Sequence, residues 1–208
     1  ADYWEGEERM RLLNYQMISI GVVGAVLFVI GGALGEYSWR TPFLLYLLPL
    51  LLIPAMLKIL WEPAVRQQTV IESSEKVSIP TVVIGYLLIF GGMLFVFIAP
   101  VQCPVLMVSM GITSSTLIGL CAGVGLVATL IGSLLWPVFR HLLGIRGCNA
   151  LLLFLLALGL WLLGSAQSYN AVMLAIGIHG IGAGLFVPNA MAPVMNALSS
   201  STRGRGPG

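Results

Sequence analysis

Long apolar runs without a single charged side chain dominate the second half of the chain. Residues 77–139 contain no Lys, Arg, Asp or Glu, and residues 147–202 again contain none. A helix that crosses a membrane needs about 20 predominantly apolar residues. Each run is therefore long enough for two crossings and a turn, and the polar clusters at 109–116 and 164–170 mark the two turns.

Two more apolar runs precede these stretches, separated by polar residues 35–42. The runs are too long for barrel strands, which alternate over about ten residues, and a helix satisfies its own backbone in lipid. The pattern predicts an all-α, polytopic membrane protein with six transmembrane helices. The expected spans are 17–34, 43–60, 81–101, 117–137, 149–165 and 171–195.

Composition excludes several other classes of protein. The 208 residues are 58% hydrophobic and only 9% charged, whereas an average soluble domain carries roughly 25% charged residues. A soluble domain, a nucleic-acid-binding protein and a disordered chain are all excluded by this deficit. The net charge of +2 is too small to indicate a polyanionic partner, and three scattered cysteines imply no disulfide framework.

Basic residues sort to one side of the predicted spans. Only Arg40 falls in the connections at 35–42, 102–116 and 165–170. Because cytoplasmic loops carry the excess of Lys and Arg, these three connections should face outward and both ends of the chain should be cytoplasmic. This expectation fails if Arg66 and Arg140 lie on opposite faces. The nine basic residues on the predicted cytoplasmic side are Arg9, Arg11, Lys58, Arg66, Lys76, Arg140, Arg146, Arg203 and Arg205.

Five segments, taken together and in order, resemble the major facilitator superfamily of permeases. Residues 31–43 (GGALGEYSWRTPF) resemble the link between its fifth and sixth helices, and residues 61–63 (WEP) the start of its central cytoplasmic loop. Residues 110–115 (MGITSS) resemble the turn between helices seven and eight, residues 180–188 (GIGAGLFVP) the tenth helix, and residues 203–204 the basic loop after it.

The resemblance implies that the chain covers about helices five to ten of a twelve-helix fold. Residues 1–60 would then be the last two helices of the N-terminal half, 61–79 the central loop, and 80–208 the first four helices of the C-terminal half. It implies a secondary active transporter of the bacterial inner membrane that moves a small molecule, in the direction of efflux, by alternating access. The partners implied are a small-molecule substrate, protons as a candidate coupling ion, the lipid bilayer and the missing helices.

Two family signatures are incomplete in this chain. The antiporter signature places a Gly-Pro pair shortly before Gly31 and Gly32, where this chain has Leu27 and Phe28. The cytoplasmic gate motif survives between helices eight and nine only as a gate-like set, Arg140, Gly144 and Arg146. For these arginines, topology control and an interdomain latch are both open roles.

Polar side chains inside the spans are the candidates for a substrate or proton path. His179 is an ionisable group deep in a span, a costly placement that defaults to a functional hypothesis, and hydrogen bonding between helices is the alternative. Asn189 follows Pro188, and a proline frees a carbonyl in a helix that can border a transport site. Tyr86 and Gln102 lie along the third span, where lipid contact or packing is the alternative.

Other classes of function leave little trace in the sequence. The motifs HExxH, CxxC, Walker A and GxSxG are absent. The sequence therefore predicts no catalytic residue, no metal site and no cofactor. A membrane-embedded protease using a serine with His179, or a structural membrane protein, remain the alternatives. Glu36 and Arg40 share one short connection and could form an exposed ion pair there.

Overall fold

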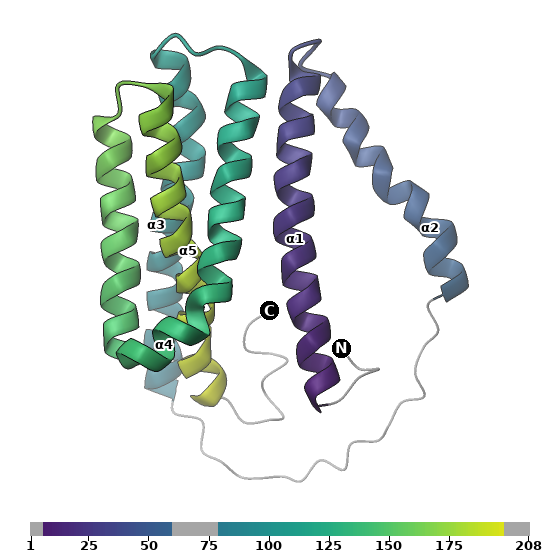
Figure 1. Cartoon of the computed structure of the whole chain (residues 1–208). Coiled ribbons are helices and arrows are strands. Elements are labelled where there is room, and N and C mark those ends of the chain that lie inside the picture. The colour runs from purple at the N-terminus through teal and green to yellow at the C-terminus, as the bar shows by residue number, and fades with distance from the viewer. Residues whose placement is uncertain (1–5, 60–78, 198–208) are drawn as a thin grey trace.

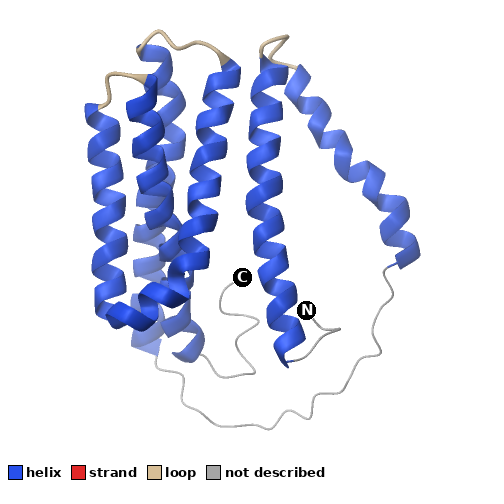
Figure 2. Ribbon diagram, viewed as in Figure 1, coloured by secondary structure: helices blue, strands red, loops and turns tan. Residues whose placement is uncertain are grey.

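The described part of the chain is a bundle of long helices. The computed structural model describes residues 6–59 and 79–197, and within these ranges it contains helices and no strand, which confirms the predicted all-α class (Figure 2). The predicted central loop at 61–79 lies almost entirely outside the described residues. The elements are α1 (Gly6–Gly35), the 3-10 helix η1 (Thr41–Leu47), α2 (Leu48–Ile59), α3 (Ile79–Ser109), α4 (Ser115–Ser165) and α5 (Tyr169–Ala197).

Helix α4 contains two of the six predicted spans. Five helices of the described residues are long and apolar enough to cross a membrane, and α4 alone has 51 residues. A straight helix of that length would measure about 76 Å, more than twice the hydrocarbon thickness. The chain instead folds back at Gly144, whose φ of 65° and ψ of −173° are essentially restricted to glycine (Figure 1). We call residues 115–143 the first arm and residues 145–165 the second arm.

The second predicted span begins as a 3-10 helix for a reason visible in the sequence. Pro49 has no N–H to offer the carbonyl of Leu45, so the N–H of Leu48 donates to that carbonyl instead, closing a tighter turn. Residues 41–59 form a continuous apolar segment. With rises of about 2.0 Å and 1.5 Å per residue, η1 and α2 together reach about 32 Å, enough to span the bilayer.

The third span is longer than predicted, and the connection predicted at 102–116 is wrong in extent. Pro100 and Pro104 lie inside α3, which continues to Ser109, because lipid-embedded helices tolerate proline where neighbours re-satisfy the backbone. The helix ends with Gly111 in the left-handed region, while Gly111 and Ile112 donate to the carbonyls of Val108 and Met107. This pair of bonds is a Schellman motif, and only residues 110–114 remain as the connection.

Helix α5 lies between the two arms of α4, in contact with both (Figure 1). A Cβ at Gly180 would lie 2.8 Å from Cβ of Ala128, and one at Gly184 would overlap the carbonyl oxygen of Thr129, both on the first arm. On its other side, a Cβ at Gly182 would lie 3.0 Å from N of Leu156 on the second arm. Small residues that allow backbones to approach are the usual basis of helix association in lipid.

Helix α1 packs against the first arm in the same way near one end. A Cβ at Gly119 would lie 2.9 Å from Cα of Gly32. Farther along, Gly24 and Gly21 face the side chains of Leu126 and Leu130, which fill the widening space between the helices. We call the end where α1 and α4 approach most closely the Glu36 end, and the opposite end the Gly144 end.

Helix α2 stands apart from the rest of the bundle. None of its residues is buried, and it leans away from α1 toward its Ile59 end (Figure 1). An apolar helix exposed on every side needs lipid or further protein around it. The same applies to the outward face of α3, where Leu87, Phe90 and Val101 are exposed.

Substitution of alanine for glycine should have opposite effects at two positions of α5. We expect Gly184→Ala to lower the free energy of unfolding by about 1–3 kcal/mol, because the added Cβ overlaps the first arm. Gly177 has nothing within 4 Å of an added Cβ, so Gly177→Ala should raise it by about 0.5–1 kcal/mol through helix propensity. Unfolding in detergent micelles measures both, and equal effects at the two sites would contradict the packing described.

Candidate functional site

Asn189 is the centre of a polar cluster that joins three segments near the Gly144 end. Its side chain is 1% exposed. Its Oδ1 accepts hydrogen bonds from Nη1 of Arg140 at 3.0 Å and from Nε1 of Trp136 at 3.2 Å. Its Nδ2 donates to Oδ1 of Asn149 at 2.5 Å. The cluster therefore connects α5 to the first arm through Arg140 and Trp136, and to the second arm through Asn149.

The chemistry of this cluster suits a structural link. An amide is neutral but offers both an acceptor and a donor, so one buried Asn189 can satisfy a guanidinium, an indole N–H and a second amide at once. Arg140 thereby bonds within the same group of helices, α4 and α5. The structure brings together Arg140 and Asn189, which the sequence assigned to different sites.

The other two gate-like residues lie beside the cluster at the turn of α4. Gly144 is the residue at which the helix reverses, and nothing lies within 4 Å of an added Cβ there, so its requirement for glycine comes from backbone conformation. Arg146 follows it and is exposed. The arrangement leaves topology control open for Arg146, which has no hydrogen bond to other described residues.

His179 lies in the middle of α5 and is 3% exposed. Its Nε2 is 3.1 Å from the backbone carbonyl oxygen of Phe95 on α3. Because a carbonyl oxygen can only accept, Nε2 carries the hydrogen and donates it. On the other side of His179, Gly159 of the second arm packs so closely that a Cβ at position 159 would overlap His179. His179 therefore joins α3 to α5 beside the second arm.

Tyr86 and Gln102 lie on the exposed surface of α3, whereas His179 and Asn189 are buried. Tyr86 is 40% exposed on α3. Gln102 is exposed and lines a shallow hollow of about 310 Å³ whose other lining residues, among them Phe90 and Val101, are also on α3. Of the four residues predicted for a substrate or proton path, His179 and Asn189 are thus inside the bundle, and Tyr86 and Gln102 are on its surface.

Glu36 makes a contact that the sequence did not suggest. Its carboxylate oxygen Oε1 accepts a hydrogen bond from Oγ of Ser114 at 2.5 Å and from the backbone N–H of Thr116 at 2.9 Å. These two bonds, from the Ser114 hydroxyl first and the Thr116 N–H second, hold the pKa of the Glu36 carboxyl below its ordinary value of 4.5. The start of α4 attracts a carboxylate because its N–H groups lack helical partners.

The expected pair between Glu36 and Arg40 is not formed. Arg40 instead lies over the ring of Trp39, with its Cζ 5.0 Å from the ring centroid. The helix terminus offers Glu36 fixed donors, whereas an exposed ion pair gains little after the cost of ordering two side chains. The prediction from sequence proximity was therefore wrong.

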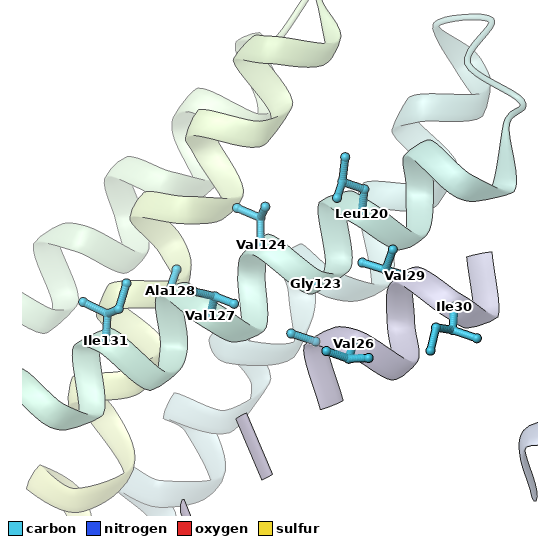
Figure 3. A pocket seen from close by; sticks show the side chains of 10 residues that line it. Val26, Val29, Ile30, Leu120, Gly123, Val124, Val127, Ala128 and Ile131 are labelled. Atoms are coloured by element: carbon cyan, nitrogen blue, oxygen red, sulfur yellow. The ribbon is translucent and has the colours of Figure 1, made fainter. Parts of the chain in front are cut away.

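An apolar hollow of about 470 Å³ lies between α1 and the first arm (Figure 3). Val26 and Val29 approach it from α1, and Val124 and Val127 from α4. No polar or titratable side chain lines it, so the hollow offers no group for acid–base chemistry or metal binding. Elsewhere in the described residues, no cluster of three or more His, Cys, Asp or Glu side chains is placed to hold a metal ion.

Two residues of the Asn189 cluster were missed by the sequence. Trp136 has the position of an interface anchor near a span end, and its indole N–H is used inside the bundle instead. Asn149 lies 40 positions before Asn189. The available signal was Asn149 itself, an amide at the start of an otherwise apolar stretch of α4, since such residues bond across helices in membranes.

The whole chain matches one known family. The sequence model of the Major Facilitator Superfamily matches residues 1–208. The chain therefore belongs to the major facilitator superfamily, a family of membrane transporters whose members are not enzymes. No curated protein and no solved structure matches the chain significantly. The resemblance found in the five sequence segments is confirmed at the level of the family.

Removal of the Asn189 side chain should destabilise the bundle far more than removal of its exposed partner. We expect Asn189→Ala to lower the free energy of unfolding by about 2–4 kcal/mol, because it leaves a guanidinium and an indole N–H without their acceptor. Asn149→Ala should cost about 1 kcal/mol or less, since Asn149 is exposed and water can replace it. Denaturation in detergent compares the two, and similar costs would show that the cluster is not centred on Asn189.

Proposed function

We propose that this chain is six consecutive helices of a twelve-helix permease that moves a small molecule across the bacterial inner membrane. The observation that carries the proposal is the family match over residues 1–208. We assign α1 and α2 to the N-terminal half, residues 61–79 to the central loop, and α3 to α5 to the C-terminal half. The exposed faces of α2 and α3 support this division, since further helices of the same permease would cover them.

The orientation proposed is that the Gly144 end faces the cytoplasm. Lys58 in the last turn of α2, together with Arg140 and Arg146 around the turn of α4, lie at that end, whereas Arg40 lies in the connection at the Glu36 end (Figure 1). This distribution of cations fits the excess of Lys and Arg in cytoplasmic loops. Both ends of the chain would then be cytoplasmic.

Transport would proceed by alternating access, in which one half of the permease rocks against the other around a central site. The Asn189 cluster and the glycine contacts hold α4 and α5 together, which suits a half that moves as a body. We place the direction as export, on the resemblance to efflux permeases. A proton gradient is the proposed driving force, with the coupling residue in helices outside this chain.

An enzymatic function receives no comparable support. The rival was a membrane protease that uses a serine with His179. In the described residues the hydrogen-bond partner of the His179 ring is the carbonyl of Phe95, and no serine hydroxyl is hydrogen-bonded to it. A structural scaffold is disfavoured by the family, whose members transport.

The chain alone should not transport. Two helices of one half and four of the other cannot enclose a site between two complete halves. Purified residues 1–208 and the permease from the complete reading frame would be reconstituted in liposomes and tested with labelled sugars and amphipathic cations. We expect saturable flux only from the complete permease, and saturable flux from residues 1–208 would overturn the division proposed here.

We propose that His179 holds α3 against α5. In this role its ring does not gain or lose a proton during transport. Glutamine has a side-chain N–H that can donate to the carbonyl of Phe95 but does not titrate. In the complete permease, His179→Gln should therefore keep the pH profile of transport, and His179→Leu should lower the free energy of unfolding by about 1–3 kcal/mol. A flattened pH profile in His179→Gln would instead place His179 on a proton path.

A further inference from the structure

Within residues 6–59 and 79–197, the Glu36 contact is the one hydrogen-bonded link between the two segments that we assign to different halves. Glu36 follows the last residue of α1, whereas Ser114 and Thr116 lie at the start of α4, 78 and 80 positions later. At Gly32 and Gly119 the two helices touch through backbone, and farther along they are lined by apolar side chains. The link is therefore the specific polar element of this interface in the described residues.

Both hydrogen bonds end on the same carboxylate oxygen of Glu36, and both of their donors belong to the start of α4. Oε1 of Glu36 accepts from Ser114 and Thr116, while Oγ of Ser114 accepts from the N–H of Leu117 at 3.3 Å as the N-cap of the helix. Glu36 and Ser114 together satisfy two backbone donors that the first turn leaves without helical partners. Opening this end would leave the Thr116 N–H, the Ser114 hydroxyl and the carboxylate of Glu36 without these partners, whereas the bond from Leu117 to Ser114 lies within α4 and would remain.

The packing beneath the link shows that the interface is closed at this end. A Cβ at Gly35 would lie 3.0 Å from Cβ of Ser115, and one at Gly119 would lie 2.9 Å from Cα of Gly32. Toward the Gly144 end the contact is made by leucine side chains, and the apolar hollow opens between the helices. The helices thus diverge away from Glu36 (Figure 1).

We propose that Glu36 is a positioning residue of the transport cycle, whose carboxylate holds the two halves closed at the Glu36 end and must release the start of α4 before that end can open. The inference rests on the proposed function, since only a permease that alternates access needs such a release. This role differs from capping within one half, because Glu36 and the helix end that it binds belong to different halves. Contact with lipid would not require such a bond.

The distance between the two halves at this end provides the test. Spin labels would be attached in the complete permease at Tyr37→Cys and Gln167→Cys, two exposed positions in separate connections at the Glu36 end. Pulsed electron spin resonance would measure the ratio of long to short distances. The native cysteines Cys103, Cys121 and Cys148 are buried, and the permease without introduced cysteines gives the background.

We expect Glu36→Ala to raise the ratio of open to closed forms by roughly two- to fivefold, the range for an exposed polar link. Glu36→Gln should raise it less, because the amide oxygen can still accept both bonds while the charge is lost. Arg40→Ala is the matched control, because Arg40 lies in the same connection and stacks on Trp39 without bonding to α4. It should leave the ratio unchanged.

A change of pH gives a second test, in which the wild-type residues Glu36, Ser114 and Thr116 are all kept. Because the closed form lowers the pKa of Glu36 from 4.5, its stabilisation is complete above that value and is lost as the pH falls through the lowered pKa. Comparison at about pH 7 and about pH 3.5 should show opening in the wild type and none in Glu36→Gln. The other titratable side chains nearby are Arg40 and Tyr37 on the same connection and Tyr169 of α5, which donates to the carbonyl of Leu117.

The outcomes separate the inference from the proposed function. Unchanged distances in Glu36→Ala, in a permease that transports, would overturn the role of Glu36 and leave the transporter intact. Absence of flux from the complete wild-type permease would overturn the proposed function, and the inference with it. Opening in Glu36→Ala with faster exchange between the two forms during transport supports both.

Discussion

Close approach of helix backbones is the constraint on which the rest of this structure depends. In lipid, apolar side chains gain nothing by leaving the solvent, so helices associate through contact and hydrogen bonds. Glycines on both sides of α5 bring it against the two arms of α4, and Gly32 with Gly119 brings α1 against the first arm. His179 reaches the carbonyl of Phe95, and Asn189 reaches both arms, only because these backbones lie so near.

Much of the fold could be predicted from the sequence because hydrocarbon imposes a length. The charge-free runs gave the correct number of crossings, including the two within α4. The limits of the elements were harder to predict, since they depend on local hydrogen bonds. The third span was expected to end at residue 101, but α3 continues through Pro104 to Ser109, while Pro49 changed the type of helix around Leu45.

The contacts of the candidate site were less accessible to sequence reasoning. His179 and Asn189 could be selected because a polar group in lipid is costly and needs a partner. Their partners could not, because hydrogen bonds to the carbonyl of Phe95 or to Asn149 depend on how helices rotate about their axes. Glu36 shows the same limit: Arg40 is its neighbour along the chain, but the start of α4 is its neighbour in space.

The reversal of α4 at Gly144 has a consequence for how this protein can be altered. The two arms are joined by helix throughout, with one non-helical residue between them, so no slack is present to accept an inserted tag or to admit a protease. The space between the two arms is filled by α5, which contacts both of them. The short connection at Gly144 thus fixes where each arm begins, and a change of length at this turn would shift both arms against α5.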